Sequence, residues 1–275
     1  MRLRALPRLV RATNLLIAAA GVLAGGWIAL GRVAVPGGLL LAALSGIALG
    51  ASGNVWNDLW DVPADRVNRP GARPLAEGAV SRGAARGIVV AAGAVGLGLA
   101  LLVSPPLGAL GAAALVVMLL YSPALKPRPT IGNLAVALVA GVPPLYGALA
   151  VGLPRAGLVP WALAAWLHLV REIVKDVEDE PGDRALGRRT LPIVVGRRPA
   201  QVAAAGVGLL FVPASLLLPR AAGYGTAYFL IALLAQMAVL VAATWLLLDR
   251  VAPVSAVLKT AMVIGIVALV AGKVT

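Results

Sequence analysis

Residues 38–66 read GLLLAALSGIALGASGNVWNDLWDVPADR, and residues 157–184 read GLVPWALAAWLHLVREIVKDVEDEPGDR. In each stretch an apolar run passes directly into the acidic pattern D-x-x-D-x-P-x-D-R, which begins at Asp58 in the first and at Asp176 in the second. Apolar runs of this kind are typical of helices that cross a bilayer. The two stretches therefore predict two similar membrane helices that end in the same acidic motif, which is a weak internal repeat.

The composition places the whole chain in the same class. Of its 275 residues 60% are hydrophobic and only 13% are charged, with a mean hydropathy of +0.93. A soluble domain carries about a quarter charged residues. Nine apolar runs of membrane length predict an all-α polytopic membrane protein, built as a single domain over residues 1–275. The predicted spans are 12–31, 38–56, 86–103, 107–121, 131–151, 157–174, 199–218, 224–247 and 253–272.

Proline and glycine set the expected ends and bends of these helices. The second span is expected to continue to about residue 62 and the sixth to about residue 180. Pro63 and Pro181 are then expected to end the regular helix before Asp65 and Asp183. Within the fifth span, the run Gly141-Val142-Pro143-Pro144 predicts a kink rather than a break.

The basic residues predict the orientation of the chain in the membrane. The net charge is +13, and 19 Lys and Arg residues fall on the predicted inner side. The predicted outer side has four, Arg32, Arg155, Arg220 and Lys273. This asymmetry predicts the N-terminus inside and the C-terminus outside, and it accounts for the positive charge without a nucleic-acid partner. The absence of cysteine excludes disulfides, thiolate zinc sites and a thiol nucleophile.

The acidic residues are concentrated rather than scattered. Ten of the eleven lie in, or within two residues of, the two long inner connections at about 57–85 and 174–198. At about 100° per helical residue, the three aspartates of each motif project within a narrow arc. Two such clusters repel each other unless positive charge lies between them, either arginine or a divalent cation. The six aspartates are Asp58, Asp61, Asp65, Asp176, Asp179 and Asp183.

This mixture of acidic and basic residues at one membrane face fits a magnesium–diphosphate site. Mg²⁺ binds carboxylate, water and phosphate oxygens, and neighbouring Arg and Lys hold the remaining phosphate charge. Such a site makes a diphosphate a good leaving group, and a cavity between helices suits a hydrocarbon attached to it. The alternative is that the aspartates and arginines pair only to shape the two loops.

Several short motifs resemble the UbiA family of intramembrane prenyltransferases. The first acidic motif, with the residue before it, is NDLWDVPAD at 57–65, and NRPGARPL follows at 68–75. The second motif places Asp176, Asp179 and Asp183 at the matching spacing. Between them lie YSPALK at 121–126 and Gly132-Asn133, and RATN stands at 11–14 near the start. The resemblance covers essentially the whole chain.

The resemblance implies nine helices around a central cavity, with a cytoplasmic polar cap in which two Mg²⁺ ions hold a prenyl diphosphate. It implies metal binding by Asp58, Asp61, Asp65, Asp176, Asp179 and Asp183, among which Asp61, Asp65, Asp179 and Asp183 are the expected catalytic set. It implies substrate binding by Asn57, Arg69, Arg73, Lys126, Arg11 and Asn14.

The function that follows is Mg²⁺-dependent transfer of a prenyl group from its diphosphate to a lipid-soluble acceptor at the cell membrane. Residues 171–196 resemble the branch of the family that transfers a geranylgeranyl group to geranylgeranylglyceryl phosphate. The acceptor phosphate would need further basic residues, for which Arg188, Arg189 and Arg197 are candidates. The only histidine, His168, is either a helix–helix hydrogen-bonding group or a substrate contact.

Three other functions stay open at this point. The first is prenylation of an aromatic acceptor such as a quinone precursor. The second is a membrane transporter, although a transporter is expected to carry ionisable groups near mid-membrane, whereas here they gather at helix ends. The third is a lipid-binding scaffold without catalysis, in which the aspartates would be dispensable.

Overall fold

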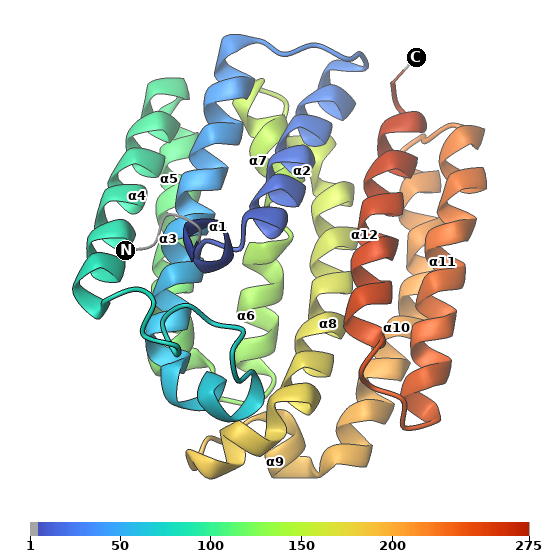
Figure 1. The fold of residues 1–275 in the computed structure, drawn as a ribbon. Helices are drawn as coiled ribbons and strands as arrows, with labels where there is room; N and C mark the ends of the chain where they lie inside the picture. Colours follow the sequence, from blue (N-terminus) through green and yellow to red (C-terminus); the bar gives the residue numbers. More distant parts are fainter. Residues whose placement is uncertain (1–4, 275) are drawn as a thin grey trace.

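The computed structural model describes residues 5–274, and all regular structure in this part of the chain is helical (Figure 1). The long helices stand side by side with their axes roughly aligned. Two short segments, η2 (Tyr121–Leu125) and η3 (Pro154–Gly157), are a π-helix and a 3₁₀-helix. The α-helices are α1 (Leu6–Leu9), α2 (Ala12–Leu30), α3 (Gly37–Asn68), α4 (Arg82–Val103), α5 (Pro105–Leu120), α6 (Ile131–Ala140), α7 (Pro143–Ala150), α8 (Leu158–Ala185), α9 (Leu191–Val195), α10 (Arg197–Ala221), α11 (Thr226–Leu247) and α12 (Val254–Ala271).

The predicted set of membrane spans is confirmed. Within residues 5–274, eight helices are long and apolar enough to cross a bilayer, and the α6–α7 pair makes up to nine. This pair is bent by 41° at Gly141 and Val142, where the helix is interrupted. The expected kink is thus a short break between two helices, because two successive prolines at 143 and 144 remove backbone donors there.

Three apolar clusters among the described residues hold the bundle together. One joins α8, α10, α11 and α12 through side chains such as Val174, Leu246 and Leu258. A second joins α2, α3, α4, α5 and α7, where Val22 and Leu39 are completely or almost completely buried. The third packs α1 and the C-terminal half of α3 against the start of α4. Residues of α2, α8 and α12 line the cavity described below.

The helices α3 and α8 continue past the prolines that were expected to end them, and this expectation was wrong. Pro63 lies inside α3 and Pro181 inside α8, so Asp65 and Asp183 are both helical. A proline frees the carbonyl four residues before it. In α8 that carbonyl belongs to Val177, and it accepts a hydrogen bond of 2.8 Å from Arg197.

The ends of α3 and α8 also stabilise each other. The Asn68 side chain donates to the carbonyl of Asp179 at 3.0 Å and accepts from the backbone N–H of Gly182 at 2.8 Å. These contacts between elements outweigh the local effect of the prolines. The connections are accordingly shorter than expected, since α3 ends at Asn68 and α8 at Ala185.

Helices α2 and α7 cross with almost no space between their backbones. A Cβ atom at Gly25 would collide with the backbone of Pro144, and one at Gly147 would collide with the carbonyl of Val22. Small residues at such crossings let membrane helices approach closely. The crossing fixes α7 against α2 beside the cavity.

We expect Gly147→Ala to lower the thermal unfolding temperature in detergent, because the added methyl forces two backbones apart. Overpacking of this kind costs about 1–3 kcal/mol. Gly98→Ala in α4 is the matched control, since a Cβ there meets no atom within 4 Å, and its unfolding temperature should not fall. Equal unfolding temperatures for the two variants would contradict the tight crossing.

Candidate functional site

The two acidic motifs meet at one end of the bundle. The C-terminal part of α3 carries Asp58, Asp61 and Asp65, and that of α8 carries Asp176, Asp179 and Asp183. All are buried except Asp179, which is partly exposed. The structure thus brings together the six aspartates that the sequence singled out. They come from the lower ends of α3 and α8, which lie near each other in Figure 1.

Two basic side chains connect the motifs directly. Lys126 Nζ lies 3.1 Å from Asp61 and 4.0 Å from Asp183. Arg188 Nη1 lies 2.8 Å from Asp61 and 3.0 Å from Asp183. Burial lowers the pKa of Arg188, but the two carboxylates outweigh it and raise that pKa above its ordinary value. Its guanidinium therefore stays charged between the motifs.

A third bridge is made by Arg69. Its guanidinium lies 2.6 Å from Asp179 on α8 and 3.4 Å from Asp65 on α3. Charge-assisted pairs of this geometry are stronger than neutral hydrogen bonds. Together with Lys126 and Arg188, Arg69 supplies the positive charge that two facing carboxylate clusters require.

The first motif is also held from the N-terminal side. Arg11 stands at the start of α2 with a left-handed φ of 58°, an uncommon conformation for a residue other than glycine. Its side chain donates to Asn57 at 3.0 Å and pairs with Asp58. Arg73 approaches the same motif, 3.8 Å from Asp58 and 3.7 Å from Asp65.

Two neutral polar groups complete the arrangement. Asn133 Nδ2 donates to Asp176 at 2.8 Å, while its Oδ1 accepts from the backbone of Thr130 at 3.2 Å. Asn57 Nδ2 donates to Ser122 Oγ at 2.8 Å. The segment from η2 to the start of α6 thus contacts both motifs. Ser122 and Asn133 were seen only as parts of motifs and received no role from the sequence.

The donor set fits a hard divalent cation. Carboxylate oxygens are what Mg²⁺ prefers, and the Oδ2 atoms of Asp58 and Asp183 are buried without a hydrogen-bond partner in the described part of the chain. Over residues 5–274 no three such groups already converge on one point, because Lys and Arg stand between them. A cation bound here would displace or share these basic partners.

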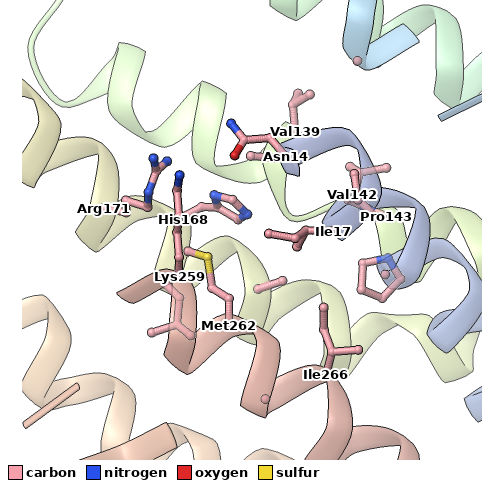
Figure 2. Close-up of a pocket in the computed structure, with 18 of the residues that line it drawn as sticks. Asn14, Ile17, Val139, Val142, Pro143, His168, Arg171, Lys259, Met262 and Ile266 are labelled. Atoms are coloured by element: carbon pink, nitrogen blue, oxygen red, sulfur yellow. The ribbon is translucent and has the colours of Figure 1, made fainter. Parts of the chain in front are cut away.

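A cavity of about 350 Å³ lies beside the first motif, where Asn57 and Arg11, the neighbours of Asp58, line it. Near the motifs it is lined by Arg11, Asn14 and Asn57, and farther in mostly by apolar side chains. Figure 2 shows Ile17, Val139, Met262 and Ile266 around this apolar part. Asn14, a predicted substrate contact, lies on the cavity wall, and no contact of it with an acidic motif is found among the described residues.

Comparison with known proteins identifies the family. The sequence model of the UbiA prenyltransferase family matches residues 18–271. The digeranylgeranylglyceryl phosphate synthase of Thermococcus gammatolerans is 44% identical over 232 residues, which cover 83% of this chain and 82% of that protein.

Solved structures agree with this match. One, from a study of digeranylgeranylglyceryl phosphate synthase in membranes, has a TM-score of 0.78 at 27% identity and covers 99% of this chain and 98% of that one. A UbiA homolog from Archaeoglobus fulgidus, solved with GPP and Mg²⁺, shares the fold with a TM-score of 0.66 at 17% identity, over 98% of each chain. The chain is a multi-pass membrane protein that belongs to the UbiA prenyltransferase family.

Proposed function

We propose that this chain transfers a geranylgeranyl group from its diphosphate to geranylgeranylglyceryl phosphate in a Mg²⁺-dependent reaction. The observation that carries the proposal is that two acidic motifs meet across a layer of basic side chains, beside a largely apolar cavity. The names of the relatives support the choice of acceptor. The homolog with GPP and Mg²⁺ supports the choice of donor and metal.

The proposed roles follow the chemistry of each group. Asp58, Asp61, Asp65, Asp176, Asp179 and Asp183 hold the metal, whose charge makes the diphosphate a better leaving group. Lys126, Arg69 and Arg73 bind phosphate oxygens, with Asn57 and Arg11 beside them and Asn14 on the cavity wall.

The reaction is a substitution at an allylic carbon. The free hydroxyl oxygen of the glyceryl group forms the new ether bond, and the carbon–oxygen bond to the diphosphate breaks. The electron pair of that bond leaves with the diphosphate, and the hydroxyl proton is released. The chain contributes by positioning both substrates and by excluding water from the apolar cavity.

The same proposal includes the topology. The acidic motifs lie at the C-terminal ends of α3 and α8, and the connections that follow them carry many of the Lys and Arg residues, so we expect this end to face the cytoplasm by the positive-inside rule. The N-terminus then lies inside and the C-terminus outside, with the chain acting as one membrane domain. Labelling single introduced cysteines at 78 and 223 from either side of sealed vesicles tests this: position 78 should react only from the cytoplasmic side.

Product analysis tests the acceptor. Purified protein in lipid nanodiscs with Mg²⁺ and labelled geranylgeranyl diphosphate should form the diether phosphate when geranylgeranylglyceryl phosphate is supplied. An aromatic hydroxy acid supplied in its place should yield no prenylated product. Prenylation of the aromatic acid alone would replace this proposal with the quinone-precursor alternative, and release of no diphosphate together with substrate flux in vesicles would favour a transporter.

A further inference from the structure

The cavity holds a second group of charged side chains, separate from the acidic motifs. Arg171 and Lys175 on α8 and Lys259 on α12 all line it, and we call these three residues the basic cluster. Figure 2 shows Arg171 and Lys259 with their nitrogen atoms gathered near His168, while Ile17 and Ile266 line the other part of the cavity. Nothing in the acidic motifs requires cations at this place.

The basic cluster carries more positive charge than its contacting carboxylates balance. Among residues 5–274, the one carboxylate in direct contact with it is Glu172, which Lys175 Nζ approaches at 2.8 and 2.9 Å and Arg171 at 3.6 Å. Lys259 makes no hydrogen bond or ion pair with any residue between 5 and 274, and its charged neighbours are the cations Arg171, Lys175 and Arg11 and the carboxylate Glu178. In this part of the chain the three cations therefore have one carboxylate in contact, Glu172, and a second, Glu178, without a direct ion pair.

Two further atoms lack partners within residues 5–274. Arg171 Nε and His168 Nδ1 are both buried with no hydrogen bond there. Like charges close together repel, and a buried N–H donor without an acceptor is unfavourable. An anionic ligand with acceptor oxygens would relieve both the repulsion and the unpaired Arg171 donor.

The basic cluster is distinct from the groups that face the donor diphosphate. Lys126, Arg188 and Arg69 are already paired with aspartates of the motifs. Arg171 lies five residues before Asp176, which is about 7.5 Å along the helix axis at 1.5 Å per residue. Lys175 directly precedes Asp176 in the chain, but its ammonium contacts Glu172 at 2.8 Å. Arg11 stands between the two groups, since it lines the cavity and also contacts Asn57 and Asp58.

We propose that Arg171, Lys175 and Lys259 bind the phosphate monoester of the lipid acceptor. This inference rests on the proposed function, because only a glyceryl phosphate acceptor brings such a group. The three oxygens of a phosphate monoester match the planar donors of arginine and the point charges of lysine. The glyceryl hydroxyl lies close to that phosphate in the acceptor, so the cluster holds it near the acidic motifs.

The arginines first considered for this role are placed elsewhere. Arg188 is bound to Asp61 and Asp183, and Arg197 pairs with Glu180 at 3.3 Å. Arg189 is exposed. None of the three lines the cavity, so residues of the spans themselves replace the loop residues as the acceptor site.

The test measures the KM for the acceptor and the KM for the donor separately in Lys259→Met. This change removes the charge and nearly keeps the length of the side chain. We expect the KM for geranylgeranylglyceryl phosphate to rise by about 10- to 100-fold, the range for loss of one charged hydrogen bond. The KM for geranylgeranyl diphosphate and the kcat at saturating acceptor should stay unchanged. Lys259→Arg should restore most of the acceptor affinity.

Two controls test whether a change in acceptor KM comes from a lost contact with the acceptor phosphate. Lys273→Met removes a lysine that bonds to the carbonyl of Ala222, outside the cavity, and its kinetics should match the wild type. Geranylgeranylglycerol, which lacks the phosphate, should bind Lys259→Met and the wild type equally weakly. Without donor or metal, the phosphate acceptor should raise the unfolding temperature of the wild type and of Lys273→Met more than that of Lys259→Met.

The outcomes distinguish failure of the inference from failure of the proposed function. If the wild type transfers nothing to the glyceryl phosphate, the proposed function fails and this inference falls with it. If the wild type is active but Lys259→Met and Arg171→Gln both keep its acceptor KM, only the inference is overturned. A rise in the donor KM instead would assign the basic cluster to the diphosphate and would equally overturn it.

Discussion

Asp61→Asn is expected to lower kcat for prenyl transfer by more than about 100-fold, since loss of even an outer partner of a metal ligand typically costs 10- to 100-fold. Asp61 is the carboxylate at which the two motifs meet, because Lys126 and Arg188 both contact it and both also approach Asp183. The change keeps the size of the side chain and removes one negative charge. Steady-state release of diphosphate from geranylgeranyl diphosphate measures the effect.

The control separates this role from general charge effects in the cap. Glu77→Gln removes an acid from the same end of the molecule, where Glu77 pairs with Arg8 at 3.0 Å and both side chains are partly exposed. Exposed pairs of this kind contribute about 0–1 kcal/mol, so this variant should keep its activity. A kcat within tenfold of the wild type for Asp61→Asn would contradict the metal role.

A double variant distinguishes metal binding from structural pairing of Asp61 with Lys126. Replacing both, as Asp61→Asn with Lys126→Met, restores the charge balance of the pair. If the Asp61–Lys126 pair is only structural, the loss in Asp61→Asn comes entirely from leaving Lys126 unpaired. The double variant should then recover stability and activity together. We expect recovered stability, measured by thermal unfolding, without recovered activity.

The membrane-spanning helices could be predicted from the sequence because each of them is a long apolar run. The predicted span 12–31 corresponds to α2 (Ala12–Leu30), and 253–272 corresponds to α12 (Val254–Ala271). The errors lie where tertiary contacts override local propensity. The bonds of Asn68 to the end of α8, and of Arg197 to the carbonyl freed by Pro181, keep α3 and α8 helical beyond the predicted ends.

The aspartates of the site could also be predicted, since their spacing shows which of them share a helix face. The positions of the Lys and Arg residues of the site could not. Arg188 was considered for an acceptor and lies between Asp61 and Asp183, and Arg171, Lys175 and Lys259 received no site role. Lysine or arginine within or just beyond an apolar span is costly and typically functional, and Lys259 carried that signal. The other two members of the basic cluster come from α8, 84 to 88 positions earlier in the chain, and only the packing of α12 on α8 brings them near Lys259.

Lys126→Met is expected to lower kcat/KM for geranylgeranyl diphosphate by about 100-fold, the usual loss for one preorganised donor to a developing charge. The Lys126 side chain is only 10% exposed, and its ammonium lies within reach of Asp61 and Asp183 from opposite motifs. It is thus the cation best placed to receive the negative charge that the diphosphate gains as its bond to carbon breaks. Pre-steady-state formation of product, measured at saturating acceptor, isolates this step.

Arg128→Met is the matched control, because Arg128 lies two residues away in the same connection and is exposed. It removes the same amount of charge from the same face, so any loss through long-range attraction of the anionic donor should appear in both variants and fade with salt. The loss of kcat/KM that is specific to Lys126→Met should persist at high ionic strength, since the Lys126–Asp61 pair is almost fully shielded from solvent. Equal, salt-sensitive losses in the two variants would show that Lys126 only contributes to the net positive charge of the cap, and the diphosphate would then need another direct partner.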